Sequence, residues 1–271
     1  MQLLRNLLFV FTLLPMSAGV QAGLFSIDMS FNSNVDDIYK PLFEQAADEW
    51  ESYILGTQEN YDVTLSVTSS LYTGTSGGVL ASAGPDIGYH GNNYLYAIEG
   101  SMNFDSTDIS SLYSSGLLYH VILHELAHVI GFGTLWDTSI FSLSPPAQNV
   151  VAEFSDGTTT NKHYVGQYAL DLYREVYDSS AVYIPLETTG GAGTAGSHWD
   201  EFWMGITSLD ELMTGYISST PFLSDVSIAS FADIGYVVQL QDGRILGVVS
   251  TPATLFILLS ALIFMVSRRT R

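Results

Sequence analysis

Five consecutive residues, His124-Glu125-Leu126-Ala127-His128, form the pattern in this sequence that can do chemistry most directly. They lie in an apolar stretch, from Gly116 to Ile130, that predicts a helix. Two histidines four residues apart lie on the same helix face, so both imidazoles can reach one metal ion. Glu125 then points to the open side of the metal, where its carboxylate can take a proton from a bound water. The pattern is typical of a zinc-dependent hydrolase.

The chain must supply a third ligand, because a catalytic zinc usually has three protein ligands and one open position. Gly131 lies three residues after His128 and lets the chain leave the helix and turn back toward the metal. The position six residues after His128 would suit a histidine in a compact site, but Thr134 occupies it and is not a zinc ligand. The third ligand therefore comes from further along the chain, and His198 is the best candidate. The alternative is a chance match, with the histidines packed in a core.

Three other histidines are interpreted as structural or surface residues. His120 lies four residues before His124 on the same helix face. A fourth histidine ligand would close a site that a hydrolase needs open, so we assign His120 to packing or to contacts with the ligands. His163 lies in a predicted polar loop and His90 near a predicted edge strand, and we expect both at the surface.

Two segments after the helix resemble those of the leishmanolysin-like metzincin peptidases. They are Gly196-Ser197-His198-Trp199-Asp200-Glu201 and Glu211-Leu212-Met213-Thr214-Gly215. The resemblance continues through residues 132–136 (FGTLW) and 230–236 (SFADIGY), and in element order it runs from Ser26 to Tyr236.

This resemblance implies a role for each matching residue. His124, His128 and His198 become the ligands of a Zn²⁺ cofactor, Glu125 becomes the general base, and Met213 stands in a tight turn below the metal. The implied substrate is a protein or peptide.

The fold expected from the periodicity is α+β. Leu24–Phe31 and Tyr61–Leu71 alternate as strands, and Asp36–Leu55 between them has helical spacing. Shorter strands are predicted at Asp86–Tyr89 and Leu95–Asn103. A helix between two strands favours their parallel pairing. With the resemblance, this predicts a metzincin-like catalytic domain in which a twisted mixed sheet packs on two long helices.

The C-terminal half is expected to carry the distal zinc ligand, the methionine turn and the last helix. Residues 136–197 are loop-like in composition, with one helix predicted at Gln167–Tyr177 and a last helix at Leu223–Ile234. We expect the peptidase domain to span residues 23–240 and a linker to span residues 241–250.

Both ends of the chain have the composition of targeting segments. Residues 1–22 contain a basic residue, an apolar run from Leu7 to Leu14 and small residues before the cleavage position, which predicts a signal peptide. Residues 251–271 contain an apolar run and three terminal arginines, which predicts a transmembrane segment with a basic cytoplasmic tail.

The C-terminal segment also resembles a PEP-CTERM sorting signal, although its motif Thr251-Pro252-Ala253 lacks the usual glutamate after proline. This resemblance implies an exosortase as a partner and export across the inner membrane of a Gram-negative bacterium. The domain would then face outward on a membrane anchor, or reach the cell surface or the medium after tail processing.

Charge and cysteine content exclude some functions. All 28 acidic residues but only four of the eight basic residues lie between the terminal segments, a formal charge of −24 for that part. Such a surface repels nucleic acid, which we exclude as a partner. With no cysteine, an exported chain of this size must depend on its apolar core.

The sequence thus predicts an exported zinc endopeptidase in which Glu125 activates a zinc-bound water. Two alternatives remain open at this point. One is a catalytically silent, zinc-stabilised surface or matrix protein, and the other is a zinc hydrolase of a non-peptide bond.

Overall fold

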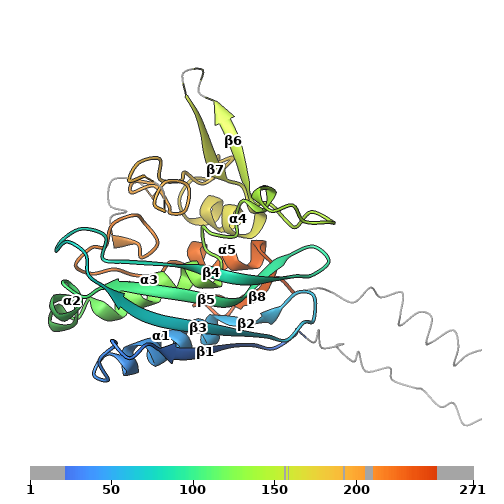
Figure 1. Cartoon of the computed structure of the whole chain (residues 1–271). Helices are drawn as coiled ribbons and strands as arrows, with labels where there is room; N and C mark the ends of the chain where they lie inside the picture. The colour runs from blue at the N-terminus through green and yellow to red at the C-terminus, as the bar shows by residue number, and fades with distance from the viewer. Residues whose placement is uncertain (1–21, 156, 158, 192, 205–209, 249–271) are drawn as a thin grey trace, which may run out of the picture. The chain divides into compact units, whose positions relative to one another are not determined.

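A computed structural model describes residues 22–155, 157, 159–191, 193–204 and 210–248, and residues 22–248 form one compact unit (Figure 1). The first part of this unit contains most of the strands. Its elements are β1 (Phe25–Phe31), α1 (Lys40–Tyr53), β2 (Ile54–Thr57), β3 (Val63–Tyr72), β4 (Ala81–His90), β5 (Leu95–Asp105), α2 (Ile109–Ser115) and α3 (Leu118–Ile130).

The second part contains a 3-10 turn, a hairpin, two helices and two short strands. They are η1 (Thr138–Ile140), β6 (Val151–Ser155), β7 (Thr160–Tyr164), α4 (Gln167–Val176), α5 (Asp225–Asp233), β8 (Tyr236–Gln239) and β9 (Ile245–Leu246).

The main sheet is mixed and has the strand order β1-β3-β5-β4. β1 pairs parallel with β3, and β3 pairs parallel with β5, whereas β4 pairs antiparallel with β5. The parallel pairing of β1 with β3 across α1 confirms the expected crossover. β4 is hydrogen-bonded on one side only and therefore forms an edge of the sheet.

α1 and α3 both pack against this sheet, as the α+β prediction required. α1 begins at Lys40 rather than Asp36, and Pro41 stands in its first turn, where proline costs no hydrogen bond. Its Phe43 makes edge-to-face contacts with Phe31 of β1 and Phe104 of β5, at centroid distances of 5.5 and 5.2 Å. These contacts fix the helix layer on the sheet.

The second part of the unit connects to the first through aromatic contacts and a smaller sheet. β8 pairs with β2 and β9, so the end of the described chain returns to the end of α1. Trp50 of α1 lies edge-on to Phe231 of α5, with 5.0 Å between the centroids. The hairpin β6–β7 projects beyond α4 (Figure 1).

α4 and α5 are joined by a buried carboxylate. Asp233 accepts hydrogen bonds from the backbone N–H groups of Tyr168 and Ala169 and from the hydroxyl of Tyr164. The first two donors belong to the first turn of α4, whose free N–H groups favour a negative charge. A Cβ on Gly166 would lie 2.6 Å from this carboxylate, so the helix begins at a residue without a side chain.

Two expectations about element boundaries were wrong. The active-site helix begins two residues later than expected: Gly116 has φ +78° and ends α2, and α3 runs from Leu118 to Ile130. Residues 151–155 and 160–164 are not loop but pair as the antiparallel strands β6 and β7, with His163 in β7. The strands are rich in polar residues, so their composition concealed the alternation.

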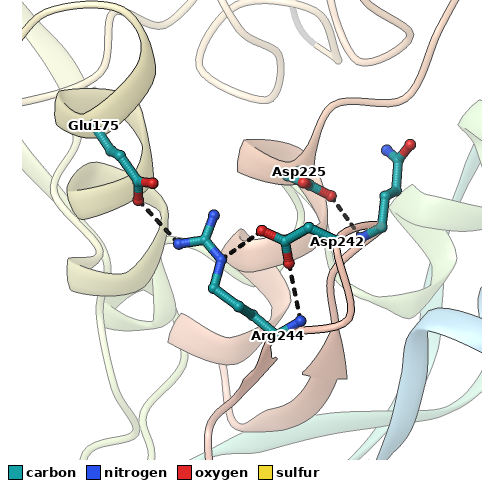
Figure 2. A network of polar contacts seen from close by, with 5 residues as sticks. Glu175, Asp225, Asp242 and Arg244 are labelled. Carbon is teal, nitrogen blue, oxygen red and sulfur yellow. Dashed lines mark hydrogen bonds and ion pairs between the residues drawn. The ribbon is translucent and has the colours of Figure 1, made fainter.

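The range predicted as a linker, 241–250, starts with ordered structure. β9 lies within it, and the compact unit extends to Val248. Figure 2 shows how side chains attach this turn: Arg244 donates to Glu175 of α4 and to Asp242, and the backbone N–H of Gln241 donates to Asp225 of α5. The compact unit therefore includes residues 241–248, and the bounds of the peptidase domain stay a prediction.

The signal peptide and transmembrane tail predicted for residues 1–22 and 251–271 lie outside the described residues, apart from Ala22. Within the described ranges, no helix has the length and apolar character needed to cross a membrane.

Candidate metal centre

Helix α3 and a distant loop bring three imidazole nitrogens to one point. The Nε2 atoms of His124 and His128, one turn apart on α3, are 3.0 Å from each other. His198, from the loop after α4, places its Nε2 3.1 Å from that of His124 and 3.0 Å from that of His128. These are the three residues that the resemblance named, and within the described residues they form the one histidine or acidic cluster with metal-ligand spacing.

The other ring nitrogen of each histidine faces a backbone carbonyl oxygen. The Nδ1 atoms of His124, His128 and His198 lie 2.7, 2.8 and 3.1 Å from the carbonyl oxygens of Leu212, Phe132 and Thr194, respectively. A carbonyl oxygen can only accept, so each Nδ1 carries the proton in the neutral ring. The three Nε2 lone pairs then point at one another with no donor between them.

This arrangement fits a metal cation. The Nε2 atoms are 3.0–3.1 Å apart, and their lone pairs repel each other unless a positive charge lies between them. A carbonyl oxygen that accepts from the other ring nitrogen is a common way to orient a metal-ligating imidazole. Two nitrogens bound tetrahedrally to one Zn²⁺ lie about 3.3 Å apart, from Zn–N distances of about 2.0–2.1 Å. The observed triangle is close to that size. Three neutral imidazoles are also the donor type that zinc prefers.

Burial keeps these histidines neutral. Desolvation lowers the pKa of His124 to about 4 and that of His198 to about 3, and it lowers the pKa of His128 well below its usual range. The neighbouring rings add to the effect at His128 and His198. The trio is therefore in the deprotonated form that binds a metal across the neutral pH range.

Glu125 is buried beside this cluster and has no partner of its own. Glu125 is 7% exposed, and its carboxylate makes no hydrogen bond or ion pair with any residue that the structure describes. Desolvation raises its pKa to about 8. A carboxylate without a structural partner, held one residue from a candidate ligand, is available for proton transfer.

The approach of the third histidine depends on two glycines after α3. Gly131, with φ +140°, ends the helix as expected. Gly133, with φ +71°, was not singled out from the sequence. A Cβ there would lie 2.3 Å from the carbonyl oxygen of Ser197, so only glycine allows the loop before His198 to lie this close to the end of α3.

Met213 lies in a segment that contacts both ligand-bearing parts of the cluster. Its side chain is fully buried, and its carbonyl oxygen accepts from the backbone N–H of Trp199, at 3.1 Å. The residue before it, Leu212, supplies the carbonyl partner of His124. The structure thus places Met213 next to both segments that carry ligands, and its assignment as the turn methionine stays a prediction.

The remaining histidines lie apart from the cluster. His120 packs edge-on against Tyr119 with 5.4 Å between centroids. His163 stacks on Tyr183 at 4.0 Å, and His90 ends the edge strand β4. Sequence reasoning gave no role to Gly133, the three carbonyl partners or the buried Glu211. The resemblance had marked the segments that contain Gly133, Phe132, Leu212 and Glu211, but not the one that contains Thr194.

The structure combines an α+β domain with a cluster of three histidines that could hold a metal ion. An unpaired carboxylate lies on the helix that carries two of these histidines. This combination is typical of metal-dependent hydrolases. The family model for leishmanolysin (Peptidase_M8) matches residues 60–247, more than half of the chain. The chain belongs to the leishmanolysin family, whose members are metalloproteases that use zinc.

Individual relatives match a smaller part. The chain is 30% identical over 142 residues to a leishmanolysin homolog from Crithidia fasciculata, and over 138 and 139 residues to the leishmanolysins of Leishmania donovani and Leishmania major. Each match covers 51% of this chain but only 19%, 22% and 21% of the relative, so the chain spans about a fifth of the length of these proteins. No solved structure gives a significant match.

Proposed function

We propose that this protein is an exported metzincin-type zinc endopeptidase in which His124, His128 and His198 hold the metal and Glu125 is the general base. The convergence of three neutral imidazoles beside a carboxylate without a partner carries this proposal. Zinc, when bound, acts as a Lewis acid that activates water and polarises the scissile carbonyl. The turn containing Met213 supports the ligands from below.

Glu125 performs the proton transfers. As an ionised carboxylate it accepts the proton of the attacking water, and in its protonated form it delivers that proton to the leaving amine. Its burial favours the protonated form, and the positive charge of the metal favours the ionised form. The two effects oppose each other, which keeps the pKa of Glu125 within the range where it can both take and give a proton.

The edge strand β4 is the proposed site for the substrate backbone. It pairs only with β5, and the mid-strand residue Gly84 lies next to Thr134, which follows the metal-binding helix: a Cβ on Gly84 would be 3.8 Å from the Thr134 methyl group. An extended peptide can add antiparallel to such an edge through main-chain hydrogen bonds. Recognition of this kind places few demands on the substrate sequence.

Export and the terminal segments belong to the same proposal. Residues 1–22 would direct the chain across the inner membrane of a Gram-negative cell, and residues 251–271 would anchor it and be read by an exosortase. The supporting observation is their composition.

Glu125→Gln in the full-length, zinc-loaded protein tests the chemistry. We expect turnover of a denatured protein mixture to fall about a hundredfold to ten-thousandfold, while metal analysis still finds one zinc per chain. Glu44→Gln, an exposed position on α1, removes the same charge and should retain full turnover. Full activity of Glu125→Gln would reject the mechanism.

The same assay separates the other functions. Zinc binding without any hydrolysis by the wild type would favour a surface or matrix protein that uses the metal as a structural support. Hydrolysis of esters or amides without cleavage of any protein would favour a non-peptide hydrolase.

A further inference from the structure

Glu211 is a fully buried carboxylate, 1% exposed, that has no cationic partner among the described residues. An isolated charge in such a place is costly unless hydrogen bonds compensate it. Its two oxygen atoms accept four hydrogen bonds, and the donors come from two separate parts of the chain.

One oxygen faces the methionine turn and the other faces α5. Oε2 accepts from the backbone N–H of Met213 at 2.5 Å. Oε1 accepts from the backbone N–H and the hydroxyl of Ser224, at 3.1 and 2.9 Å, and from the hydroxyl of Ser227 at 2.6 Å. Ser224 is the N-cap of α5, so the carboxylate also lies at the end of that helix where negative charge is favoured.

The segment fixed in this way contacts both ligand-bearing parts of the metal centre. The carbonyl oxygen of Leu212 faces Nδ1 of His124, 2.7 Å away. The carbonyl oxygen of Met213 accepts from the backbone N–H of Trp199, the residue after His198. The indole Nε1 of Trp199 donates to the Ser227 hydroxyl at 2.8 Å, and this hydroxyl in turn donates to Oε1 of Glu211.

We propose that Glu211 is the positioning residue of the metal centre: its carboxylate fixes residues 211–213 to the start of α5 and thereby sets the orientation of His124 and His198. The inference rests on the proposed zinc function. Glu211 contacts neither histidine and acts through Leu212, Met213 and Ser227.

No other side chain can accept all of these hydrogen bonds from this position. Each oxygen of Glu211 faces a backbone N–H, which can only donate. Glutamine would place its NH₂ group against one of these donors, and aspartate is one methylene shorter. Hence even Glu211→Gln should disturb the segment.

The test compares zinc affinity of the full-length protein and three variants, measured by competition with a chelator. Substitutions of residues that orient metal ligands typically weaken metal binding about 10- to 100-fold, and we expect this for Glu211→Gln. Ser227→Ala removes the link between Glu211 and Trp199, together with a hydrogen bond from the Ser224 hydroxyl, and should weaken zinc binding several-fold. Ser230→Ala is the matched control, because its hydroxyl is equally buried on α5 but donates to the carbonyl oxygen of Ser227 instead.

Cobalt substitution gives a readout that a loss of stability alone would not change. The visible absorption of the Co²⁺ form reports ligand geometry, and it should shift in Ser227→Ala but not in Ser230→Ala. Urea unfolding of the metal-free proteins measures the loss of stability in each variant, so that the spectral shift can be compared with it. If Glu211→Gln does not fold, the pair of serine variants decides.

Two results would overturn the proposal: a folded Glu211→Gln with zinc affinity within twofold of the wild type, or equal weakening by both serine variants. Either could occur while the wild type still cleaves peptides, which leaves the peptidase function standing. Conversely, a wild type that binds zinc in a Glu211-dependent way but cleaves no peptide would reject the peptidase function alone.

Discussion

The two parts of the domain contribute to the metal centre by different means. The first part, through α3, supplies His124, Glu125 and His128 from one regular helix held by apolar packing on the main sheet. The second part supplies His198 from an irregular loop, and it is held there by buried polar groups such as Glu211 and Asp233. Helical geometry alone sets the spacing of the first three residues, whereas the position of the fourth depends on a network of side-chain hydrogen bonds.

This difference predicts that the metal stabilises the second part more than the first. A zinc ion bound by His124, His128 and His198 would connect α3 to the loop after α4, and metal-site binding energy is also folding energy.

The largest effects are expected from loss of a ligand. His198→Ala and His128→Ala should each reduce turnover about a thousandfold or more, since metal catalysis contributes several kcal/mol to the rate. Zinc content, turnover and hydrogen exchange are the measurements. In His198→Ala, amide protection should fall mainly in residues 194–204 and 210–233 and remain high in β1, β3 and α3. Equal loss of protection in both parts would contradict the asymmetry.

The apolar core of the first part should affect stability without affecting the metal. Phe43 is fully buried between Phe31 and Phe104, and Phe43→Ala should cost about 3–5 kcal/mol of the free energy of unfolding. Urea unfolding measures this. At a temperature where the variant is folded, its zinc affinity should match the wild type, in contrast to Ser227→Ala. Phe141→Ala, at an exposed position, serves as the control for loss of a phenyl ring.

The polar core of the second part should make stability depend on pH. Burial raises the pKa of Asp233 from 3.8 to about 6, so the native state keeps a proton that the unfolded state releases. The stabilisation from this proton is complete below about pH 3.8 and is lost as the pH rises through about 6, a loss of about 3 kcal/mol.

Urea unfolding at several pH values gives the free energy of unfolding as a function of pH. Between about pH 4 and pH 6 this free energy should fall more steeply with pH in the wild type than in Asp233→Asn. The exposed substitution Asp48→Asn should keep the wild-type slope. If the free energy of unfolding has the same pH dependence in the wild type and in Asp233→Asn, the prediction is contradicted. The hydrogen bonds from Tyr164, Tyr168 and Ala169 would then fully offset the cost of burying the charged carboxylate.

The smallest effect is expected at the surface network of Figure 2. Arg244 bonds to Glu175 at 2.9 Å and to Asp242 at 2.6 Å, but its side chain is 45% exposed. Arg244→Ala should therefore change the free energy of unfolding by about 1 kcal/mol or less, and less still at high salt. A larger change would mean that the turn before β9 is a significant support for α4.

Local sequence was enough to predict the helix, both of its histidines and the neighbouring carboxylate, because a period of 3.6 residues fixes their relative positions before any tertiary contact forms. The alternation in Leu24–Phe31 and Tyr61–Leu71 likewise predicted β1 and β3 to within about two residues. His198 was reached through a resemblance, since no local periodicity connects it to α3.

The groups that orient the site become visible only in the folded chain. The carbonyl partners of the three imidazoles come from Leu212, Phe132 and Thr194, and a main-chain oxygen leaves no trace in residue type. Gly133 and Glu211 look like ordinary loop residues until the chain is folded around them. Their roles arise from contacts between segments distant in sequence, Gly133 with Ser197 and Glu211 with the start of α5, which local patterns cannot encode.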